Sequence, residues 1–144
     1  MSKIKTFRGK LLNDTQERIY LAGDESDQGY RITKFQLMGV NENTDYEVTI
    51  QIFKTKQTSF TDDVNFDDDS LIAAALYSDS TSGGEFASQT IVFDHEVVNQ
   101  DLYIAASGPT FASPMNYYIE MEQVTMSKGE QAVVNFSAAL LHGE

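Results

Sequence analysis

Cysteine and tryptophan are absent from this sequence, and proline and histidine are scarce, with two residues each among 144. The lack of cysteine excludes disulfide bonds, thiolate zinc sites, iron–sulfur clusters and cysteine nucleophiles. The scarcity of proline, together with 41% hydrophobic residues, is not typical of a disordered or low-complexity chain. We therefore expect one ordered domain with a hydrophobic core.

Long apolar runs are also missing. No stretch approaches the roughly 18 apolar residues that a membrane-spanning helix needs. Residues 1–12 contain no apolar segment of the kind that a secretory signal requires. We accordingly expect no membrane partner, and we expect the protein to fold in a cytoplasm.

Positive charge is scarce and unevenly placed. The net charge at pH 7 is −12, and residues 57–127 contain no Lys or Arg but twelve Asp and Glu residues. Residues 1–10 show the opposite pattern, with no acidic residue and four cations, Lys3, Lys5, Arg8 and Lys10. An acidic body repels phosphate backbones, so we predict that nucleic acid is not a partner.

Alternation of apolar and polar residues dominates the sequence and predicts half-buried β-strands. The clearest case is the run of Tyr46, Val48, Ile50 and Ile52, whose intervening residues are polar. Further strands are predicted at residues 4–12, 18–21, 30–38, 90–93, 102–105 and 115–121. A spacing of about eight to twelve residues per strand is typical of a β-sandwich or barrel. We predict a single all-β domain, with residues 1–12 as a basic N-terminal arm or first strand and residues 13–144 as an antiparallel β-sandwich.

Three segments depart from simple alternation. The phase slips between Ile32 and Phe35, which indicates either a β-bulge or a strand covered on both faces. Residues 67–77 begin with acids suited to a helix N-cap, so a short helix and a turn entering a strand both stay open. Ser127 and Glu130 match a capping box, but the alternation beyond them favours a helical turn and then a strand pairing with residues 117–126. Turns are predicted at residues 24–29, 41–44, 81–84 and 108–110.

No combination of residues marks a catalytic centre. His95 lies between Asp94 and Glu96, which would suit acid–base work, but a lone histidine in a loop is more often a solvated surface residue. Glu120 and Glu122 share one face of a strand, as alternation alone produces. Because no nucleophile, base and orienting partner occur together, we predict that the protein is not an enzyme.

A run of aspartates within residues 62–69 is the only candidate metal site. Aligned with an EF-hand loop, Asp63, Asn65, Asp67 and Asp69 fall at ligand positions. However, Asp68 stands where the loop needs glycine, and Ala74 stands where it needs a bidentate glutamate. The run is therefore not an EF-hand. Because a cation relieves the repulsion between close carboxylates, we hypothesise a weakly bound divalent cation at Asp63, Asp67, Asp68 and Asp69, and we expect no other cofactor.

Several stretches resemble small structural proteins of marine tailed bacteriophages. They are FRGKL at residues 7–11, GYRITKFQLM at 29–38, DLYI at 101–104 and NYYIEMEQV at 116–124. The similarity covers most of the chain and lies in the pattern of strands. It implies a virion protein, namely a capsid decoration or cement protein with a jelly-roll-like sandwich, and it implies no catalytic residues.

The charge pattern agrees with such a role, because a strongly charged protein stays soluble until it meets the shell. We hypothesise that the N-terminal arm binds the major capsid protein or a neighbouring copy by strand addition. Its contact residues would be the cations Lys3, Lys5, Arg8 and Lys10, with Ile4 and Phe7 as apolar anchors. The expected location is the capsid surface of the virion, with homo-oligomer or lattice neighbours as further partners.

Two other classes stay open. One is a different virion part, such as a tail, neck or receptor-binding module. The other is a carbohydrate-binding sandwich. Tyr117 and Tyr118 point to opposite faces of one strand, so one of them is expected at the surface, where a tyrosine ring can stack on a sugar.

Overall fold

The structure is a computed structural model that describes residues 3–21, 27–40, 45–79 and 88–141, without the side chains of residues 136–140. Within these residues the chain forms eight strands and one helix. The strands are β1 (Lys3–Leu11), β2 (Thr15–Ile19), β3 (Gln28–Gly39), β4 (Tyr46–Phe53), β5 (Leu71–Asp79), β6 (Ser88–Phe93), β7 (Leu102–Phe111) and β8 (Met115–Thr125). The helix is α1 (Lys128–Leu141), and no described helix is long and apolar enough to cross a membrane.

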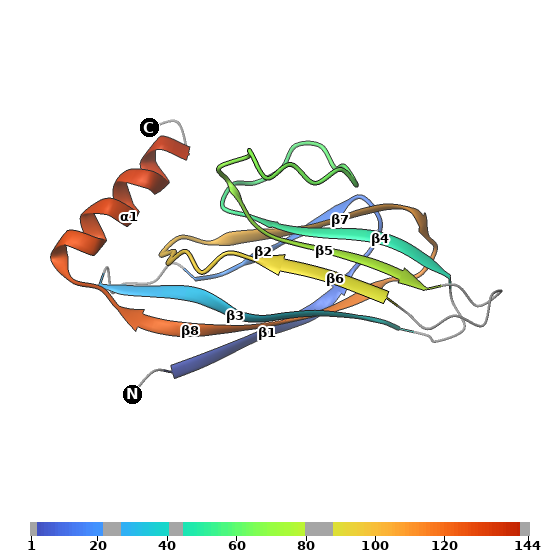
Figure 1. Cartoon of the computed structure of the whole chain (residues 1–144), viewed down its shortest axis with the longest axis horizontal. Coiled ribbons are helices and arrows are strands. Elements are labelled where there is room, and N and C mark those ends of the chain that lie inside the picture. Colours follow the sequence, from blue (N-terminus) through green and yellow to red (C-terminus); the bar gives the residue numbers. More distant parts are fainter. Residues whose placement is uncertain (1–2, 22–26, 41–44, 80–87, 142–144) are drawn as a thin grey trace.

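The strands form two antiparallel sheets packed face to face, which confirms the predicted all-β sandwich (Figure 1). One sheet has three strands in the order β1-β8-β3, and the other has five in the order β2-β7-β4-β5-β6. Consecutive strands along the chain therefore often lie in different sheets. The sequence predicts an arm or a first strand at residues 1–12, and residues 3–11 form the first strand, β1, at one edge of the three-stranded sheet.

The hydrophobic core lies between the two sheets and follows the predicted alternation. β4 contributes Tyr46, Val48, Ile50 and Ile52, all of which are buried. From the opposite sheet, β8 contributes Met115, Tyr117, Ile119 and Met121. Each such aliphatic side chain stabilises the fold by about 1.5–3 kcal/mol relative to full exposure, so these two strands anchor the sandwich.

The phase slip in the third strand is a β-bulge, as one of the two sequence interpretations predicts. The register between β3 and β8 shifts between Ile32 and Lys34, which leaves Thr33 as the additional residue. Ile32 and Phe35 are consequently both buried, while Lys34 is exposed. The bulge thus sets which side chains of the second half of β3 face outward.

The predicted turn at residues 108–110 is wrong, because β7 continues through these residues to Phe111. Gly108 and Pro109 instead lie where the register between β4 and β7 shifts, between Glu47 and Thr49. A Cβ atom on Gly108 would lie 2.1 Å from the backbone oxygen of Glu47. Glycine and proline therefore serve a bulge with a close backbone approach, not a chain reversal.

The predicted strand near the C-terminus is also wrong, since residues 128–141 are helical. The capping box forms, because Ser127 Oγ accepts a hydrogen bond from Glu130 N at 3.3 Å and Glu130 Oε1 accepts one from Ser127 N at 3.4 Å. A strand here could not have paired with β8, because β1 and β3 already occupy both of its edges.

The structure also bears on the ambiguous segment at residues 67–77 and on the other predicted turns. Residues 67–77 follow the interpretation of a turn entering a strand, because β5 begins at Leu71 after Asp68 Oδ1 accepts a hydrogen bond from Ser70 N at 2.9 Å. The predicted turns at 41–44 and 81–84 lie outside the described residues, as do residues 24–26. Gln28 and Gly29, the end of the predicted turn at 24–29, already belong to β3.

Candidate functional site

The outward face of the three-stranded sheet gathers side chains from both ends of the sequence. β8 lies between β1 and β3, and the register places four outward residues of each strand in adjacent rows. They are Ile4, Thr6, Arg8 and Lys10 in β1, Asn116, Tyr118, Glu120 and Glu122 in β8, and Arg31, Lys34, Gln36 and Met38 in β3. Their direction follows from alternation, because the intervening Leu37 and Ile119 are buried in the core.

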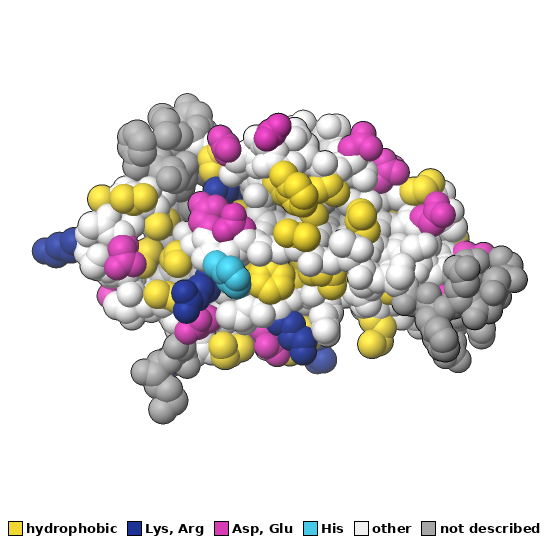
Figure 2. Space-filling model, viewed as in Figure 1, with side chains coloured by type: hydrophobic (Ala, Val, Ile, Leu, Met, Phe, Trp, Pro, Cys, Tyr) yellow, Lys and Arg dark blue, Asp and Glu magenta, His cyan; other side chains and the backbone are white. Residues whose placement is uncertain are grey.

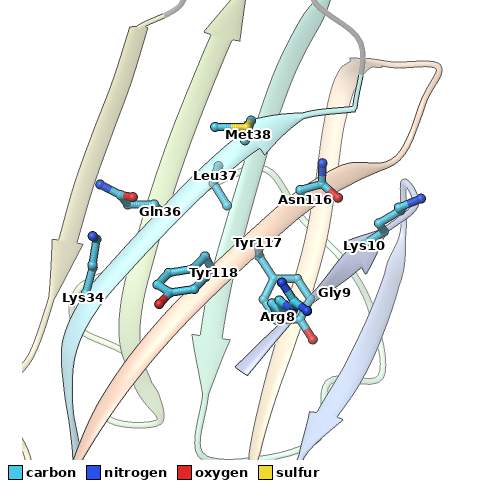
Figure 3. Close-up of a pocket in the computed structure, with 10 residues that line it drawn as sticks. All are labelled: Arg8, Gly9, Lys10, Lys34, Gln36, Leu37, Met38, Asn116, Tyr117 and Tyr118. Carbon is cyan, nitrogen blue, oxygen red and sulfur yellow. The ribbon is translucent and has the colours of Figure 1, made fainter. Parts of the chain in front are cut away.

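One end of this face is hollowed into an open depression with a volume of about 620 Å³. Figure 3 shows its lining side chains arriving from the three adjacent strands, with Tyr118 between those of β1 and β3. The outward lining residues are Arg8, Lys10, Lys34, Gln36, Met38, Asn116 and Tyr118. We call it the cationic depression, because its charged lining residues are two lysines and one arginine.

Within the part of the chain that the structure describes, the cations of this depression lack an acidic partner. Arg8, Lys10 and Lys34 form no ion pair with any carboxylate of the described residues. Lys34 Nζ instead lies 5.7 Å from the centre of the Tyr118 ring, within the range of a cation–π contact. On a chain with a net charge of −12, these three cations gather on one sheet face, Arg8 and Lys10 on one side of β8 and Lys34 on the other.

The same face also carries two acids, Glu120, which lies opposite Lys34 across the strand pair, and Glu122, which lies opposite Arg31. Glu120 Oε1 accepts a hydrogen bond from the Tyr118 hydroxyl at 2.8 Å. Glu122 Oε2 accepts one from Arg31 Nε at 2.8 Å, and the same two residues form an ion pair. The proximity of Glu120 and Glu122 therefore reflects strand geometry and pairing with neighbours.

The opposite outer face, on the five-stranded sheet, is covered in part by the chain between β4 and β5 (Figure 1). Gln51 Nε2 donates hydrogen bonds to the backbone oxygens of Thr61 and Asp63, each at 3.3 Å. Thr49 Oγ1 donates one to Asp62 O at 3.2 Å. Figure 2 shows Asp and Glu side chains along the upper edge, where this loop lies, and both basic and acidic side chains along the lower edge, where the three-stranded sheet lies.

β1 places the six predicted arm residues on two different sides. Ile4, Arg8 and Lys10 belong to the outward face, whereas Lys3, Lys5 and Phe7 point the other way. Lys5 Nζ lies 5.0 Å from the centre of the Tyr30 ring, and Phe7 packs against the core. The arm is thus not one continuous patch, and Arg8 and Lys10 join Lys34, which sequence reasoning did not select.

β1 also has a free edge, because β8 is the only strand that pairs with it among the described residues. Beside this edge lies a second open groove of about 310 Å³, which we call the edge groove. It is lined by Thr6, Phe7, Arg8, Arg18, Ile19, Tyr20 and Tyr117. Arg18 lies 5.0 Å from the centre of the Tyr20 ring and is hydrogen-bonded to Asp101, so this wall of the groove is held in place.

Tyr117 links the two sheets next to the edge groove. Its ring lies over Gly9, where an added Cβ would come within 2.9 Å of the tyrosine hydroxyl. The hydroxyl donates a hydrogen bond of 2.7 Å to Glu17 Oε2 in β2. Burial raises the pKa of Tyr117 well above its ordinary value, and the hydrogen bond to Glu17 raises it further. Tyr117 is core and Tyr118 is partly exposed, as the strand alternation predicts.

The predicted cation site does not assemble. The described residues contain no group of three or more His, Cys, Asp or Glu side chains placed to hold a metal ion. Asp63, Asp67 and Asp69 are exposed to solvent. Asp68 is instead used in the turn before β5, where its Oδ1 also accepts a hydrogen bond from Ser70 Oγ at 2.7 Å. These aspartates share a loop without converging on a common point.

His95 lies in an exposed connection after β6, and its ring packs edge-on against Phe93 at 5.7 Å. His95 thus contacts the ring of a residue two positions earlier in the same segment.

Sequence reasoning missed Lys34, Gln36 and Met38 because they join the site through pairing with β8, about eighty residues later in the chain. The phase slip after Ile32 could have indicated that Lys34, Gln36 and Met38 face outward, because the bulge there sets their direction.

No protein-family model, curated protein or solved structure matches this chain.

Proposed function

We propose that this chain is a structural protein of a virion, a decoration or cement protein that attaches to the outer surface of a shell built from the major capsid protein. The observation that carries this proposal is the placement of unpaired cations on a free edge strand of an otherwise acidic molecule. Arg8 and Lys10 lie on β1 without a carboxylate partner among the described residues. Such an edge is suited to an acidic segment of another protein.

The free edge supplies the backbone contacts. In an antiparallel pair, alternate residues direct their N–H and C=O groups away from the partner, so part of the β1 backbone faces solvent beside the edge groove. A segment that adds here as a strand would alternate its side chains between the outward cations and the groove. The apolar lining residues Phe7 and Ile19 suit an apolar side chain on the groove side.

Charge favours a partner other than a second copy at this edge. Antiparallel pairing of two β1 strands would bring Lys3, Lys5, Arg8 and Lys10 of one copy against the same cations of the other. Like charges across a strand pair are destabilising, and lysines on an edge strand are a common protection against self-pairing. An extended segment with acidic and apolar residues, presented by the shell, fits the edge better.

The sheet topology supports the jelly-roll-like arrangement expected of such a protein. A long hairpin of eight strands that rolls up pairs the first strand with the last and each following strand with the next from the other end. β1 pairs with β8, β2 with β7 and β4 with β5. β3 and β6 belong to different sheets, although Leu37 N in β3 donates a hydrogen bond of 3.1 Å to Gln89 Oε1 in β6.

Point substitutions are the appropriate test. Removing residues 1–10 would delete most of β1 and uncover β8, so loss of binding could reflect loss of folding. We therefore propose Arg8→Glu/Lys10→Glu, with Lys128→Glu as an exposed single-charge control on α1. In co-sedimentation with particles lacking the chain, the double variant should bind at least tenfold more weakly, whereas the control should bind normally. Normal binding by the folded double variant would reject β1 as the contact.

A second candidate, carbohydrate binding, is favoured by the combination of the Tyr118 ring with the amides of Gln36 and Asn116 in the cationic depression. Aromatic rings and amides are common in small-molecule sites. It is the weaker candidate because Lys34 already contacts the ring and Glu120 already binds its hydroxyl. Glycan-array binding that Tyr118→Ala abolishes would establish it in place of shell attachment.

A further inference from the structure

We propose that the cationic depression of one copy receives the acidic loop, residues 62–69, of a second copy. The occupant is therefore another molecule of this chain. The inference goes beyond the proposed function and does not depend on it, because it concerns the purified chain alone. Its contact shares Arg8 and Lys10 with the proposed shell contact but extends across β8 to β3, so Lys34 and Met38 distinguish the two contacts.

The acidic loop has the charge that the depression lacks. Asp62, Asp63, Asp67 and Asp69 are exposed, and no ion pair engages them within the described residues. Across the sandwich, Arg8, Lys10 and Lys34 are equally without acidic partners in that part of the chain. Complementary potentials of this kind orient two protein surfaces and fix their register.

The loop also offers an apolar anchor. Phe66 lies in the middle of the loop, and its side chain is 72% exposed. Its backbone neighbourhood is ordered by turn contacts, since Asn65 Oδ1 accepts a hydrogen bond from Asp67 N at 3.0 Å and Asn65 O accepts one from Asp68 N at 3.1 Å. An aromatic side chain held outward between carboxylates is typical of an interface anchor.

The depression has matching apolar and aromatic surface. Met38 is 71% exposed at its rim, and Tyr118 presents its ring between the cations. Methionine adapts its shape and makes favourable contacts with aromatic rings. A volume of about 620 Å³ admits an aromatic side chain together with its flanking carboxylates.

The two surfaces lie on opposite outer faces of the sandwich. The acidic loop is fastened over the five-stranded sheet by Thr49 and Gln51, and the depression belongs to the three-stranded sheet (Figures 1 and 3). Each copy can therefore accept one neighbour and be accepted by another. Such a head-to-tail contact produces a ring if its rotation closes and a stack if it does not, and the assembly contains more than two copies in either case.

Sedimentation velocity of the purified full chain over a range of concentrations tests this inference. The ionic strength should be about 0.15 M, where the Debye length is about 8 Å and repulsion between the net negative charges is screened beyond contact range. We expect species larger than a dimer that grow with concentration up to about millimolar. A protein that stays monomeric at the highest concentration, or forms only a dimer, would overturn the inference.

Substitutions in the depression and in the acidic loop test whether these two surfaces form the contact between copies. Lys34→Glu should weaken association about tenfold or more, whereas Lys128→Glu, which makes the same change in net charge away from the depression, should leave it unchanged. Phe66→Ala and Met38→Ala alter no charge, and each should weaken association several-fold. Circular dichroism verifies that each variant is folded. Association that survives both Lys34→Glu and Phe66→Ala in folded protein would place the contact elsewhere and refute the inference.

Zero-length cross-linking between amines and carboxylates provides a readout independent of affinity. In a mixture of isotope-labelled and unlabelled chains, we expect intermolecular links between Lys34 or Lys10 and the aspartates of residues 62–69. Mixed-isotope peptides that join other regions, with none from this pair, would contradict the proposed contact. Virion attachment is not measured in either experiment, so failure here leaves the proposed function to its own test.

Discussion

The hydroxyl of Tyr117 in β8 donates a hydrogen bond of 2.7 Å to Glu17 Oε2 in β2, and this bond joins the two sheets beside the free edge of β1. The ring that carries the hydroxyl lies directly over Gly9. The position of β1, and with it the direction of Arg8 and Lys10, therefore depends on a buried side chain in the neighbouring strand.

Tyr117→Phe should lower the free energy of unfolding by about 1 kcal/mol at neutral pH, because it removes this hydrogen bond while preserving the ring. Urea denaturation at pH 7 measures the change. Tyr20→Phe is the matched control, since the Tyr20 side chain is 71% exposed. An effect of Tyr117→Phe no larger than that of the control would contradict the linking role of the hydroxyl.

The raised pKa of Tyr117 predicts that the stability of the fold decreases at alkaline pH. The pKa of Tyr117 is raised in the folded protein, so above about pH 10 the unfolded chain releases this proton while the folded chain retains it. Stability is therefore fully present below about pH 10 and falls as the pH rises further, by up to about 1.4 kcal/mol per pH unit from this residue. Denaturation between pH 9 and pH 11 should show a shallower decline in Tyr117→Phe than in the wild type. Equal declines would contradict the assigned cause of the shift.

Gly108→Ala should destabilise the sandwich strongly, by about 2–4 kcal/mol, because the new Cβ would lie 2.1 Å from the backbone oxygen of Glu47 and the strands would have to separate. Gly129→Ala is the control, since nothing lies within 4 Å of a Cβ at that helical position. Alanine there should stabilise α1 by about 0.5–1 kcal/mol. Thermal unfolding of the two variants should shift in opposite directions, and a neutral Gly108→Ala would argue against the bulge.

Asp101→Ala should lower the free energy of unfolding by about 1–3 kcal/mol. Asp101 is only 8% exposed, and its carboxylate binds residues at the end of β2. Its Oδ1 accepts a hydrogen bond from the buried Leu21 N at 2.7 Å, and its Oδ2 accepts one from Arg18 Nε at 2.7 Å. The bond to Asp101 also raises the pKa of Arg18. Arg18→Ala should cost less, since Arg18 is half exposed and its loss leaves the Leu21 contact intact. The reverse order in chemical denaturation would refute this account.

The sequence predicts the features that depend on local periodicity. Alternation in residues 46–52 identifies β4 and its buried face, and the phase slip after Ile32 identifies the bulge in β3. Both succeed because successive side chains of a strand point to opposite faces, so core-facing residues recur every two residues. Thr49 and Gln51, on the other side of β4, are also buried, because the loop before β5 covers them. Residues 3–11, within the predicted arm or first strand, form β1, and their cations divide between two sides of the strand.

Features that depend on long-range pairing are not visible in one sequence. Lys34 joins Arg8 only because β8 pairs with both of their strands. Gly108 and Pro109 have turn chemistry, but their neighbours across the sheet make them a bulge. The segment after Ser127 alternates like a strand, yet it becomes a helix because its capping box forms and β8 has no vacant edge to receive it.

The proposal with the widest consequence is that this chain attaches to the shell of a virion. The most direct measurement is its copy number in purified particles, by quantitative mass spectrometry against the major capsid protein. The account predicts a copy number comparable to that of the shell protein, in filled heads and in heads separated from their tails. Absence of the chain from intact purified particles, or its presence only in the tail fraction, would contradict the account.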